Sequence, residues 1–144
     1  MGEAREVMDR LTAAATAGDA AAVMACYAVD AVGVTPDAGE IAGREAISAY
    51  LLGLAEAFPD IAYEYAQKHE VGNVAIDEGY ITGTNTGPLV VRPGESLPPT
   101  GKRVRMRSCD VAEVEGGLIT SHRFYFDQMD FLAQLGLLPD DMPG

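Results

Sequence analysis

The chain of 144 residues is short enough for a single domain spanning positions 1–144 and long enough to bury a substantial core. Ten Lys and Arg residues against 22 Asp and Glu residues give a net charge of −12, which excludes nucleic acids and anionic membrane surfaces as partners. Hydrophobic residues make up 48% of the sequence and charged residues 22%, a composition typical of a globular protein rather than of a disordered chain.

The first residues of the chain lack the basic stretch and the apolar core of a secretion signal, so we expect a cytoplasmic protein. The two cysteines, Cys26 and Cys109, are too few for a disulfide framework. The two histidines, His69 and His122, form no metal-binding spacing with them, and no glycine-rich phosphate loop is present. The sequence therefore predicts neither a metal nor an organic cofactor.

Helical periodicity is clearest near the N-terminus. Apolar residues between Val7 and Ala15 recur at steps of three and four, which predicts an amphipathic helix that ends at Gly18. Asp19 is a suitable N-cap for a second helix over the residues that follow. Two consecutive helices are therefore expected in this region.

The middle of the chain predicts a strand, a third helix and a loop. A short extended run over 31–35 leads to a turn at 36–39. The apolar residues of segment 47–58 then follow one helical face, and Pro59 ends that helix. Segment 88–101 holds four prolines and two glycines, which predicts a long surface loop, either a lid over a pocket or a plain connector.

The turn residues predict two β-hairpins, and the position of each turn predicts which residues of its two strands face one another. With Gly116 and Gly117 as the turn, the facing pairs are Val114 with Ile119, Ala112 with Ser121, Asp110 with Arg123, Ser108 with Tyr125, and Met106 with Asp127. With Gly72 and Asn73 as the turn, they are Val71 with Val74, His69 with Ile76, Gln67 with Glu78, Tyr65 with Tyr80, and Tyr63 with Thr82. Lys68 and Asp77 then meet on the other, solvent-facing side of the first hairpin.

The order helix, helix, strand, helix, hairpin, loop, hairpin and terminal helix predicts an α+β fold, in which a curved antiparallel sheet forms a cone with helices packed on one face. Such a cone leaves a hollow at its open end, where a hydrophobic small-molecule substrate can bind. The second face of the last hairpin is also partly apolar, since it pairs Val111 with His122, Cys109 with Phe124, and Arg107 with Phe126. This face predicts a homodimer formed through the outer side of the sheet.

Asp127 is the strongest candidate for a catalytic group. It ends the last predicted strand, facing Met106 and on the same side as Arg123 and Tyr125. A carboxyl group among apolar side chains has its charged form destabilised, which allows it to exchange a proton near neutral pH. The structural alternative is that Asp127 only caps a helix over 128–135, and the two roles are compatible.

Asp110 is a second carboxylate within a predicted strand. Its expected separation from Asp127 is about 13 Å at roughly 3.3 Å per residue, too far for a proton shared between the two. Its predicted partner is Arg123, and an ion pair between them is the structural interpretation. At the floor of a pocket the same arginine would polarise a substrate carbonyl.

Side chains of both hairpins complete the predicted site. The predicted substrate-binding residues are Tyr63, Tyr65, His69, Glu78, Met106, Asp110, Arg123 and Tyr125. His69 is either a base or a core histidine, and Glu78 is a secondary carboxylate. The tyrosines are either hydrogen-bond donors to a developing oxyanion or packing residues of the sheet.

Several segments taken together resemble one protein family. They are Ala42–Ile47, Ala57–Asp60, Gly83–Gly87, Pro99–Lys102, Gly117–Ile119, Arg123–Asp127 and Gln134–Leu137. Their order is similar to that of the SnoaL-like polyketide cyclase family, within the nuclear transport factor 2-like and ketosteroid isomerase-like superfamily. The resemblance spans nearly the whole chain.

The resemblance implies a cystatin-like α+β barrel with a deep pocket, a homodimer formed through the sheet, and no metal or organic cofactor. It also implies an intramolecular aldol condensation that closes a ring in a polyketide-like ester, with the aspartate before the Gln-Leu-Gly helix as general acid/base. By position that aspartate is Asp127. The chain departs from the family where His or Trp is common, because it has no tryptophan and Asp110 and Gly79 stand near those places.

Two other kinds of function stay open. Relatives with this fold also open epoxides, isomerise double bonds or dehydrate, and Asp110 with Arg123 would help Asp127 to position a water molecule. A non-catalytic ligand-binding protein would use Asp127 as a helix cap only.

Overall fold

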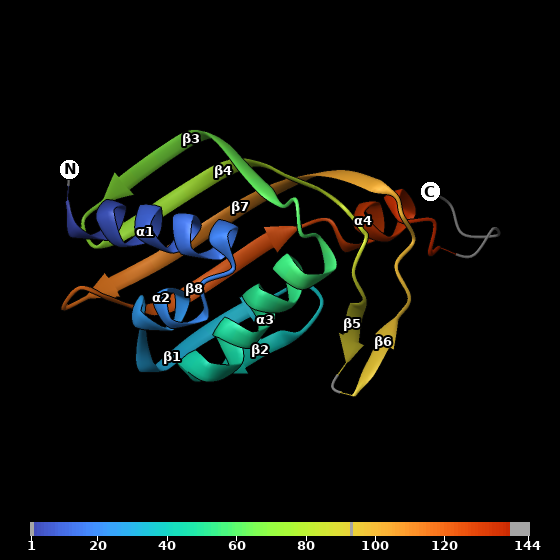
Figure 1. The fold of residues 1–144 in the computed structure, drawn as a ribbon. Helices are drawn as coiled ribbons and strands as arrows, with labels where there is room; N and C mark the ends of the chain where they lie inside the picture. The colour runs from blue at the N-terminus through green and yellow to red at the C-terminus, as the bar shows by residue number, and fades with distance from the viewer. Residues whose placement is uncertain (1, 93, 139–144) are drawn as a thin grey trace.

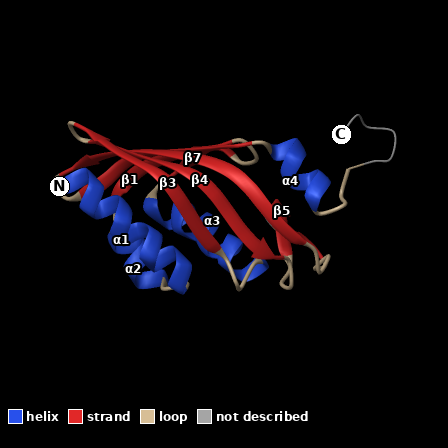
Figure 2. Cartoon of the chain, turned by 90° about the horizontal axis from the view of Figure 1, so that it is seen from above, coloured by secondary structure: helices blue, strands red, loops and turns tan. Residues whose placement is uncertain are grey.

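A curved six-stranded sheet with helices on its concave face organises the chain (Figures 1 and 2). The structure, a computed structural model, describes residues 2–92 and 94–138. It confirms the predicted α+β fold class. No helix in the described part of the chain is long and apolar enough to cross a membrane.

The ends of α1 and α3 and the start of α2 lie where the local sequence predicts, whereas α1 and α3 begin three to four residues earlier than their apolar patterns. Helix α1 (Glu3–Ala17) ends at Gly18, which adopts the left-handed conformation that glycine tolerates best, with φ of 67°. Helix α2 (Ala20–Ala25) is capped by Asp19, whose side chain accepts a hydrogen bond from the Ala22 amide at 3.1 Å. Helix α3 (Arg44–Ala57) ends just before Pro59, and helix α4 (Gln128–Gln134) follows the last strand.

The main sheet has the strand order β2-β1-β8-β7-β4-β3. Its strands are β1 (Tyr27–Thr35), β2 (Gly39–Ala42), β3 (Ala62–Val71), β4 (Val74–Thr84), β7 (Arg103–Glu115) and β8 (Leu118–Phe126). All neighbouring strands pair antiparallel except β1 and β8, which pair parallel. Parallel strands need a long connection, and the one between β1 and β8 spans most of the chain.

Segment 88–101 is not the structureless loop that its prolines predicted. It contains β5 (Leu89–Arg92) and β6 (Glu95–Leu97), which form a separate two-stranded hairpin beside α3 (Figure 1). The buried Asn85 holds the base of this hairpin, since its amide nitrogen donates to the Ala57 and Gly87 carbonyls and its oxygen accepts from the Thr100 amide and hydroxyl. Both ends of the hairpin are therefore tied to one side chain.

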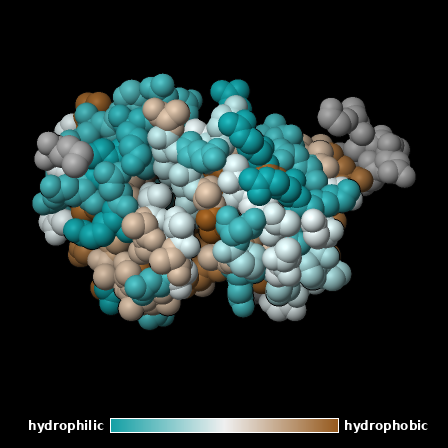
Figure 3. Space-filling view, turned by 45° about the horizontal axis from the view of Figure 1, so that its top comes forward, coloured by the Kyte–Doolittle hydropathy of each residue, from teal (hydrophilic) through white to brown (hydrophobic). Residues whose placement is uncertain are grey.

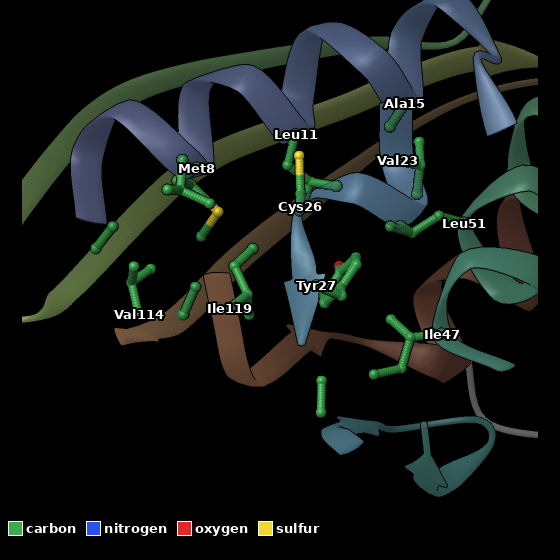
Figure 4. Packing of buried hydrophobic residues seen from close by; sticks show 14 of the residues in the cluster. Met8, Leu11, Ala15, Val23, Cys26, Tyr27, Ile47, Leu51, Val114 and Ile119 are labelled. Carbon is green, nitrogen blue, oxygen red and sulfur yellow. The ribbon is translucent and has the colours of Figure 1, made fainter. Parts of the chain in front are cut away.

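The core has two parts. The larger cluster lies between the sheet and helices α1, α2 and α3, and includes Met8, Val23, Tyr27, Leu51 and Ile119 (Figure 4). The smaller cluster joins α4, the end of α3 and the sheet through residues such as Phe58, Met106 and Phe131. The space between these clusters, under α3, is where a cavity opens.

A β-bulge in β8 overturns the predicted pairing of the last hairpin. Near the turn, Val114 faces Ile119 as predicted, but Thr120 is an extra residue and the register shifts beyond it. The observed pairs are Glu113 with Ser121, Ala112 with His122, Asp110 with Phe124, and Ser108 with Phe126. The predicted pairs of Ala112 with Ser121, Asp110 with Arg123, Ser108 with Tyr125 and Met106 with Asp127 are therefore wrong.

A second bulge, at Ala66, shifts the pairing register of the first hairpin in the same way. Residues nearest the turn pair as predicted, including His69 with Ile76 and Gln67 with Glu78. Beyond the bulge Tyr65 faces Gly79 and Tyr63 faces Ile81, so the predicted pairs of Tyr65 with Tyr80 and Tyr63 with Thr82 are wrong. Because of the extra residue, the two tyrosines lie on the inner face while His69 is exposed.

The bulges also change which residues cover the outer face of the sheet. His122 and Phe124, whose predicted place on that face suggested a dimer interface, are buried on the inner face. Lys68 and Asp77 pair as predicted, but Asp77 is buried beneath α1 rather than facing solvent. The homodimer stays a prediction.

Candidate functional site

A largely apolar cavity of about 650 Å³ lies between α3, the β5–β6 hairpin and the inner face of the sheet. Its apolar lining includes Ile41, Leu54, Ile81, Met106, Phe124, Phe126 and Phe131. A volume of this size accommodates a ligand of several fused rings. On the face drawn in Figure 3, hydrophilic residues predominate and hydrophobic residues gather in a strip near the middle.

Asp110 is the carboxylate at the polar end of this cavity, with 7% of its surface exposed. Its Oδ2 atom accepts a hydrogen bond from the Tyr65 hydroxyl at 3.2 Å and lies 3.4 Å from His122 Nε2. Its Oδ1 atom has only a long contact, at 3.5 Å, with the Ser108 hydroxyl. Oδ2 is thus held by the Tyr65 hydroxyl, with His122 Nε2 close by but without a hydrogen bond in the described structure, which leaves Oδ1 as the oxygen most available to a ligand.

His122 links Asp110 to the core. Its Nδ1 atom lies 2.8 Å from the Tyr27 hydroxyl, and its ring stacks on Phe124 with centroids 3.7 Å apart. Burial raises the pKa of Tyr27 well above its ordinary value, so the hydroxyl keeps its proton. When this hydroxyl donates its proton to Nδ1, the ring carries its proton on Nε2, the nitrogen nearest Asp110.

Tyr63 supplies a free hydrogen-bond donor. Its side chain lines the cavity, and its hydroxyl is buried without a hydrogen-bond partner in the described structure. Burial, and then the charge of Asp110, raise the pKa of Tyr63, so the hydroxyl stays protonated at neutral pH. A buried donor without a partner is costly to the fold, and a ligand oxygen would satisfy it.

The solvent end of the cavity carries two exposed carboxylates, Asp37 and Glu56. Tyr50 spans the height of the cavity wall, with its ring 5.7 Å from that of Phe124 and its hydroxyl donating to Asp37 Oδ1 at 2.9 Å. The rim is therefore acidic and the walls are aromatic, with Asp110 at the inner end.

Four of the predicted site residues meet in this place. Met106, Asp110 and Tyr63 line the cavity, and Tyr65 contacts Asp110 from β3. Tyr65 is itself largely buried, and burial raises its pKa well above the ordinary value. The structure therefore brings together residues from two strands, β3 and β7, of which Tyr65 and Asp110 are 45 positions apart in the chain.

Asp127 lies outside this cavity. It is exposed, and its Oδ1 atom accepts a hydrogen bond from the Asp130 amide at 3.0 Å, which makes it the N-cap of α4. The structural role predicted for it is confirmed. Its predicted neighbour Met106 points to the inner face, whereas Asp127 lies at a shallow depression on the outer side with Arg107 and Tyr125.

The other predicted residues also lie away from the cavity. Arg123 is on the outer face, with its Nη1 atom 2.7 Å from Glu113 Oε2, so the predicted ion pair with Asp110 is wrong. Tyr125 is 52% exposed beside it. His69 and Glu78 are exposed on the outer face of the first hairpin.

Sequence reasoning missed His122 and Tyr27, the two residues behind Asp110. The alternation of β8 carried the signal for His122, because apolar residues occupy the odd position 119 but the even positions 124 and 126. Such a change of parity within one strand indicates a bulge. Tyr27 had no comparable signal, since its partner is 95 residues away.

No cluster of three or more His, Cys, Asp and Glu side chains that could hold a metal ion occurs in residues 2–92 and 94–138. Cys109 lies on the outer face of β7 and is partly buried, and burial raises the pKa of its thiol. Cys26 is buried beneath α1, and both thiols are free. The polar groups at the inner end of the cavity are the Asp110 carboxylate, the hydroxyls of Tyr63, Tyr65 and Ser108, and the imidazole of His122 behind them.

Solved structures with the same fold include several enzymes. A proposed SnoaL-like polyketide cyclase from Jannaschia sp. CCS1 is 17% identical with a TM-score of 0.81, over 95% of this chain and 94% of its own. IdmH, a proposed polyketide cyclase from Streptomyces antibioticus, is 23% identical with a TM-score of 0.75, over 94% and 99%. An LEH-like epoxide hydrolase from M. tuberculosis is 22% identical with a TM-score of 0.69, over 92% and 89%.

These identities are too low to carry a reaction from one chain to another, so the likenesses show the fold alone. No curated protein matches the sequence. The sequence profile of the SnoaL-like domain, however, matches residues 8–122, which is most of the chain and includes Asp110 and His122. The chain therefore belongs to the SnoaL-like domain family.

Proposed function

We propose that the protein is a cofactor-independent cyclase that closes a ring in a hydrophobic, polyketide-like ester, with Asp110 rather than Asp127 as the general acid/base. The observation that carries the proposal is the position of Asp110, a carboxylate at the inner end of an apolar cavity of about 650 Å³ with one oxygen held by Tyr65 and lying against His122. The polyketide cyclases among the structural neighbours support the reaction class, which rests on analogy.

The reaction begins with proton abstraction. Asp110 Oδ1 takes a proton from a substrate carbon between two carbonyl groups, and the electrons of the broken C–H bond move onto the neighbouring carbonyl oxygen. The Tyr63 hydroxyl is free to donate a hydrogen bond to the enolate oxygen that forms. The Tyr65 hydroxyl donates to the other carboxylate oxygen, which also lies against His122, so the side chain keeps its orientation during the transfer.

Ring closure returns the proton. The enolate carbon attacks a second carbonyl carbon of the same molecule, a C–C bond forms, and the carbonyl electrons become an alkoxide. Protonated Asp110 gives its proton to this alkoxide, so the enzyme ends in its starting state. Substrate and product have the same composition, and the aromatic walls formed by Tyr50, Phe124 and Phe126 favour the folded shape that brings the two reacting carbons together.

The experiment compares wild type with Asp110→Asn and Asp127→Asn on a panel of polyketide methyl esters and small epoxides. Because an aldol product has the mass of its substrate, products are separated by liquid chromatography with absorbance and mass detection, and the reaction is repeated in D2O to detect exchange at the acidic carbon. We expect cyclised product from wild type, a loss of at least about 100-fold for Asp110→Asn, and near wild-type activity for Asp127→Asn, because Asn also caps helices.

Other outcomes identify other functions. Loss of cyclisation with Asp127→Asn but not with Asp110→Asn would return the acid/base role to Asp127. Diol formation from epoxides would indicate water activation, which the structure favours less because Arg123 pairs with Glu113 on the outer face. Binding of the esters without any turnover would indicate a ligand-binding protein.

A further inference from the structure

A buried ion pair lies directly beside Asp110 but outside the cavity. Asp77 on β4 faces Asp110 on β7 in the antiparallel register, and both side chains are buried on the inner face. Arg5 reaches Asp77 from α1, with its Nη2 atom 2.6 Å from Asp77 Oδ1. Neither Arg5 nor Asp77 lines the cavity. The pair therefore does not serve to contact a substrate bound there.

The guanidinium of Arg5 is held in place from several sides. Its Nε and Nη2 atoms donate to Asp9 Oδ1 at 3.1 and 2.8 Å, and its Nη1 atom donates to the carbonyl oxygens of His69 and Ile76 at 3.3 and 3.5 Å. Asp9 is shared with Lys68, whose Nζ atom lies 3.1 Å away. The cation therefore has a defined position under the sheet, although Arg5 has only 6% of its surface exposed.

Facing residues of an antiparallel pair have Cβ atoms about 5 Å apart, so the two carboxylates of Asp77 and Asp110 are close enough to repel. Burial raises the pKa of Asp77, the charge of Arg5 lowers it in part, and the charge of Asp110 raises it further. The negative charge of Asp77 disfavours the ionised form of Asp110. The positive charge of Arg5 beside Asp77 cancels most of that effect.

Several other ionisable groups surround Asp110. They are Tyr63 and Tyr65 on β3, Cys109 on β7, His122 on β8, Tyr27 behind it on β1, and Tyr50 on α3. Tyr27, Tyr50, Tyr63, Tyr65 and Cys109 are neutral at neutral pH, because burial raises the pKa of each. Arg5 is the cation in direct contact with Asp77, while Lys68, which faces Asp77 in the register and pairs with Asp9, also lowers the pKa of Asp77.

We propose that Arg5 is a positioning residue for catalysis, which sets the charge beside Asp110, the proposed base, by pairing with Asp77. The inference rests on the proposed role of Asp110 as base. Arg5 would thus influence catalysis from the N-terminal helix α1 without contacting the substrate, because Asp77 lies between Arg5 and the cavity.

The test measures kcat/KM against pH for wild type, Arg5→Met, Asp77→Asn and the double variant. Arg5→Met leaves Asp77 unbalanced, so the acid-side midpoint of the profile moves up by about one to two pH units. Asp77→Asn removes the negative charge that faces Asp110, so the midpoint moves down. The double variant removes both charges and returns the midpoint close to that of wild type, while Arg5→Lys, which keeps the charge, shifts it least.

Shifts of opposite sign in the two single variants are the decisive readout, because a purely structural role would slow both variants without moving their midpoints apart. Equal midpoints, or shifts of the same sign, overturn the proposal. Should Arg5→Met fail to fold, Asp77→Asn and the double variant still decide, since in Asp77→Asn the arginine keeps its bonds to Asp9.

A second readout separates this inference from the proposed function. The titration midpoint of the Asp110 carboxyl is followed by ¹³C NMR in the same variants, with Asp110→Asn identifying the signal. If Asp110→Asn retains full activity, the proposed function is wrong, yet opposite NMR shifts would still support the coupling of Arg5, Asp77 and Asp110. If Asp110→Asn is inactive and the NMR midpoints do not move, the role of Arg5 is refuted and the proposed function stands.

Discussion

The Nδ1 atom of His122 lies 2.8 Å from the hydroxyl oxygen of Tyr27, a residue 95 positions earlier in the chain. Both side chains are buried, with exposed fractions of 1% for His122 and 0% for Tyr27. Tyr27 comes from β1 and lies among Ile119, Ile47 and Leu51 in the larger core cluster (Figure 4). The hydrogen bond therefore ties the proposed catalytic network to the core of the protein.

Replacing Tyr27 with Phe removes this hydrogen bond and leaves Nδ1 of His122 buried without a partner. We expect a decrease of about 1 to 3 kcal/mol in the free energy of unfolding, together with slower turnover because the imidazole is less well oriented. Urea unfolding measures the first effect. Tyr50→Phe is the matched control, since its hydroxyl bonds to the exposed Asp37 and should cost less than about 1 kcal/mol; equal losses would contradict the prediction.

Gly53 lies within α3 and lines the cavity, and a Cβ atom added there meets nothing within 4 Å. Gly53→Ala should therefore raise the free energy of unfolding by about 0.5 to 1 kcal/mol, because alanine favours the helix. Gly53→Leu would extend into the cavity and weaken binding of an apolar fluorescent ligand, measured by titration.

Gly87 provides the control for the substitution at Gly53. A Cβ atom on Gly87 would collide with the backbone carbonyl oxygen of Glu56, so Gly87→Ala should destabilise the protein under the same conditions. A stabilising effect at both positions would contradict the predicted contrast between them, and ligand binding unchanged in Gly53→Leu would show that the cavity is not where the ligand binds.

Glu70 on β3 caps α1 from outside the helix. Its Oε1 and Oε2 atoms accept hydrogen bonds from the amides of Gly2 and Arg5 at 2.8 and 3.0 Å, and these two amides, that of Arg5 first, lower the pKa of Glu70. A carboxyl whose pKa is lower in the folded state stabilises the protein above its unfolded pKa of about 4.3, and this stabilisation is lost as the pH falls through the folded value.

Glu70→Gln should therefore lower the free energy of unfolding at pH 7 but bring it closer to that of wild type as the solution becomes more acidic. Urea unfolding at a series of pH values tests this. Glu64→Gln removes an exposed carboxylate of the same strand that has only a 4.0 Å contact with Arg105, and it should show no such convergence. A constant difference between wild type and Glu70→Gln across the series would contradict the prediction.

Thr120 is the extra residue that turns His122 and Phe124 toward the cavity. Deleting it would leave Val114 opposite Ile119 and Glu113 opposite Ser121 without a bulge, so His122 and Phe124 would keep the inner face. We therefore expect the deletion variant to retain a cooperative unfolding transition, followed by circular dichroism, with a decrease in the free energy of unfolding below about 4 kcal/mol, because only the local twist at the bulge is lost. Thr120→Ala keeps the bulge and should change stability little, whereas loss of the cooperative transition in the deletion variant would contradict the prediction.

Much of the architecture follows from local sequence. The end of α1 at Gly18, the caps at Asp19 and Asp127, and the turns at Gly72 and Gly116 all appear where their residue types predict them. Each of these features depends on interactions within a few residues. The same locality explains why Asp110 and Tyr63 were identified as candidates but His122 and Tyr27 behind them were not.

The sequence by itself determined the helices, the turns, the acidic surface and the presence of carboxylates and tyrosines in the strands. Only the tertiary structure decided that Asp110, and not Asp127, lies in the cavity, and that His122 and Tyr27 stand behind it. The reason is that strand alternation has a period of two, so one extra residue such as Thr120 exchanges the two faces, and its position is selected by what packs against the sheet. Burial against α3 and the core, which no local pattern contains, determines which face becomes the inner one.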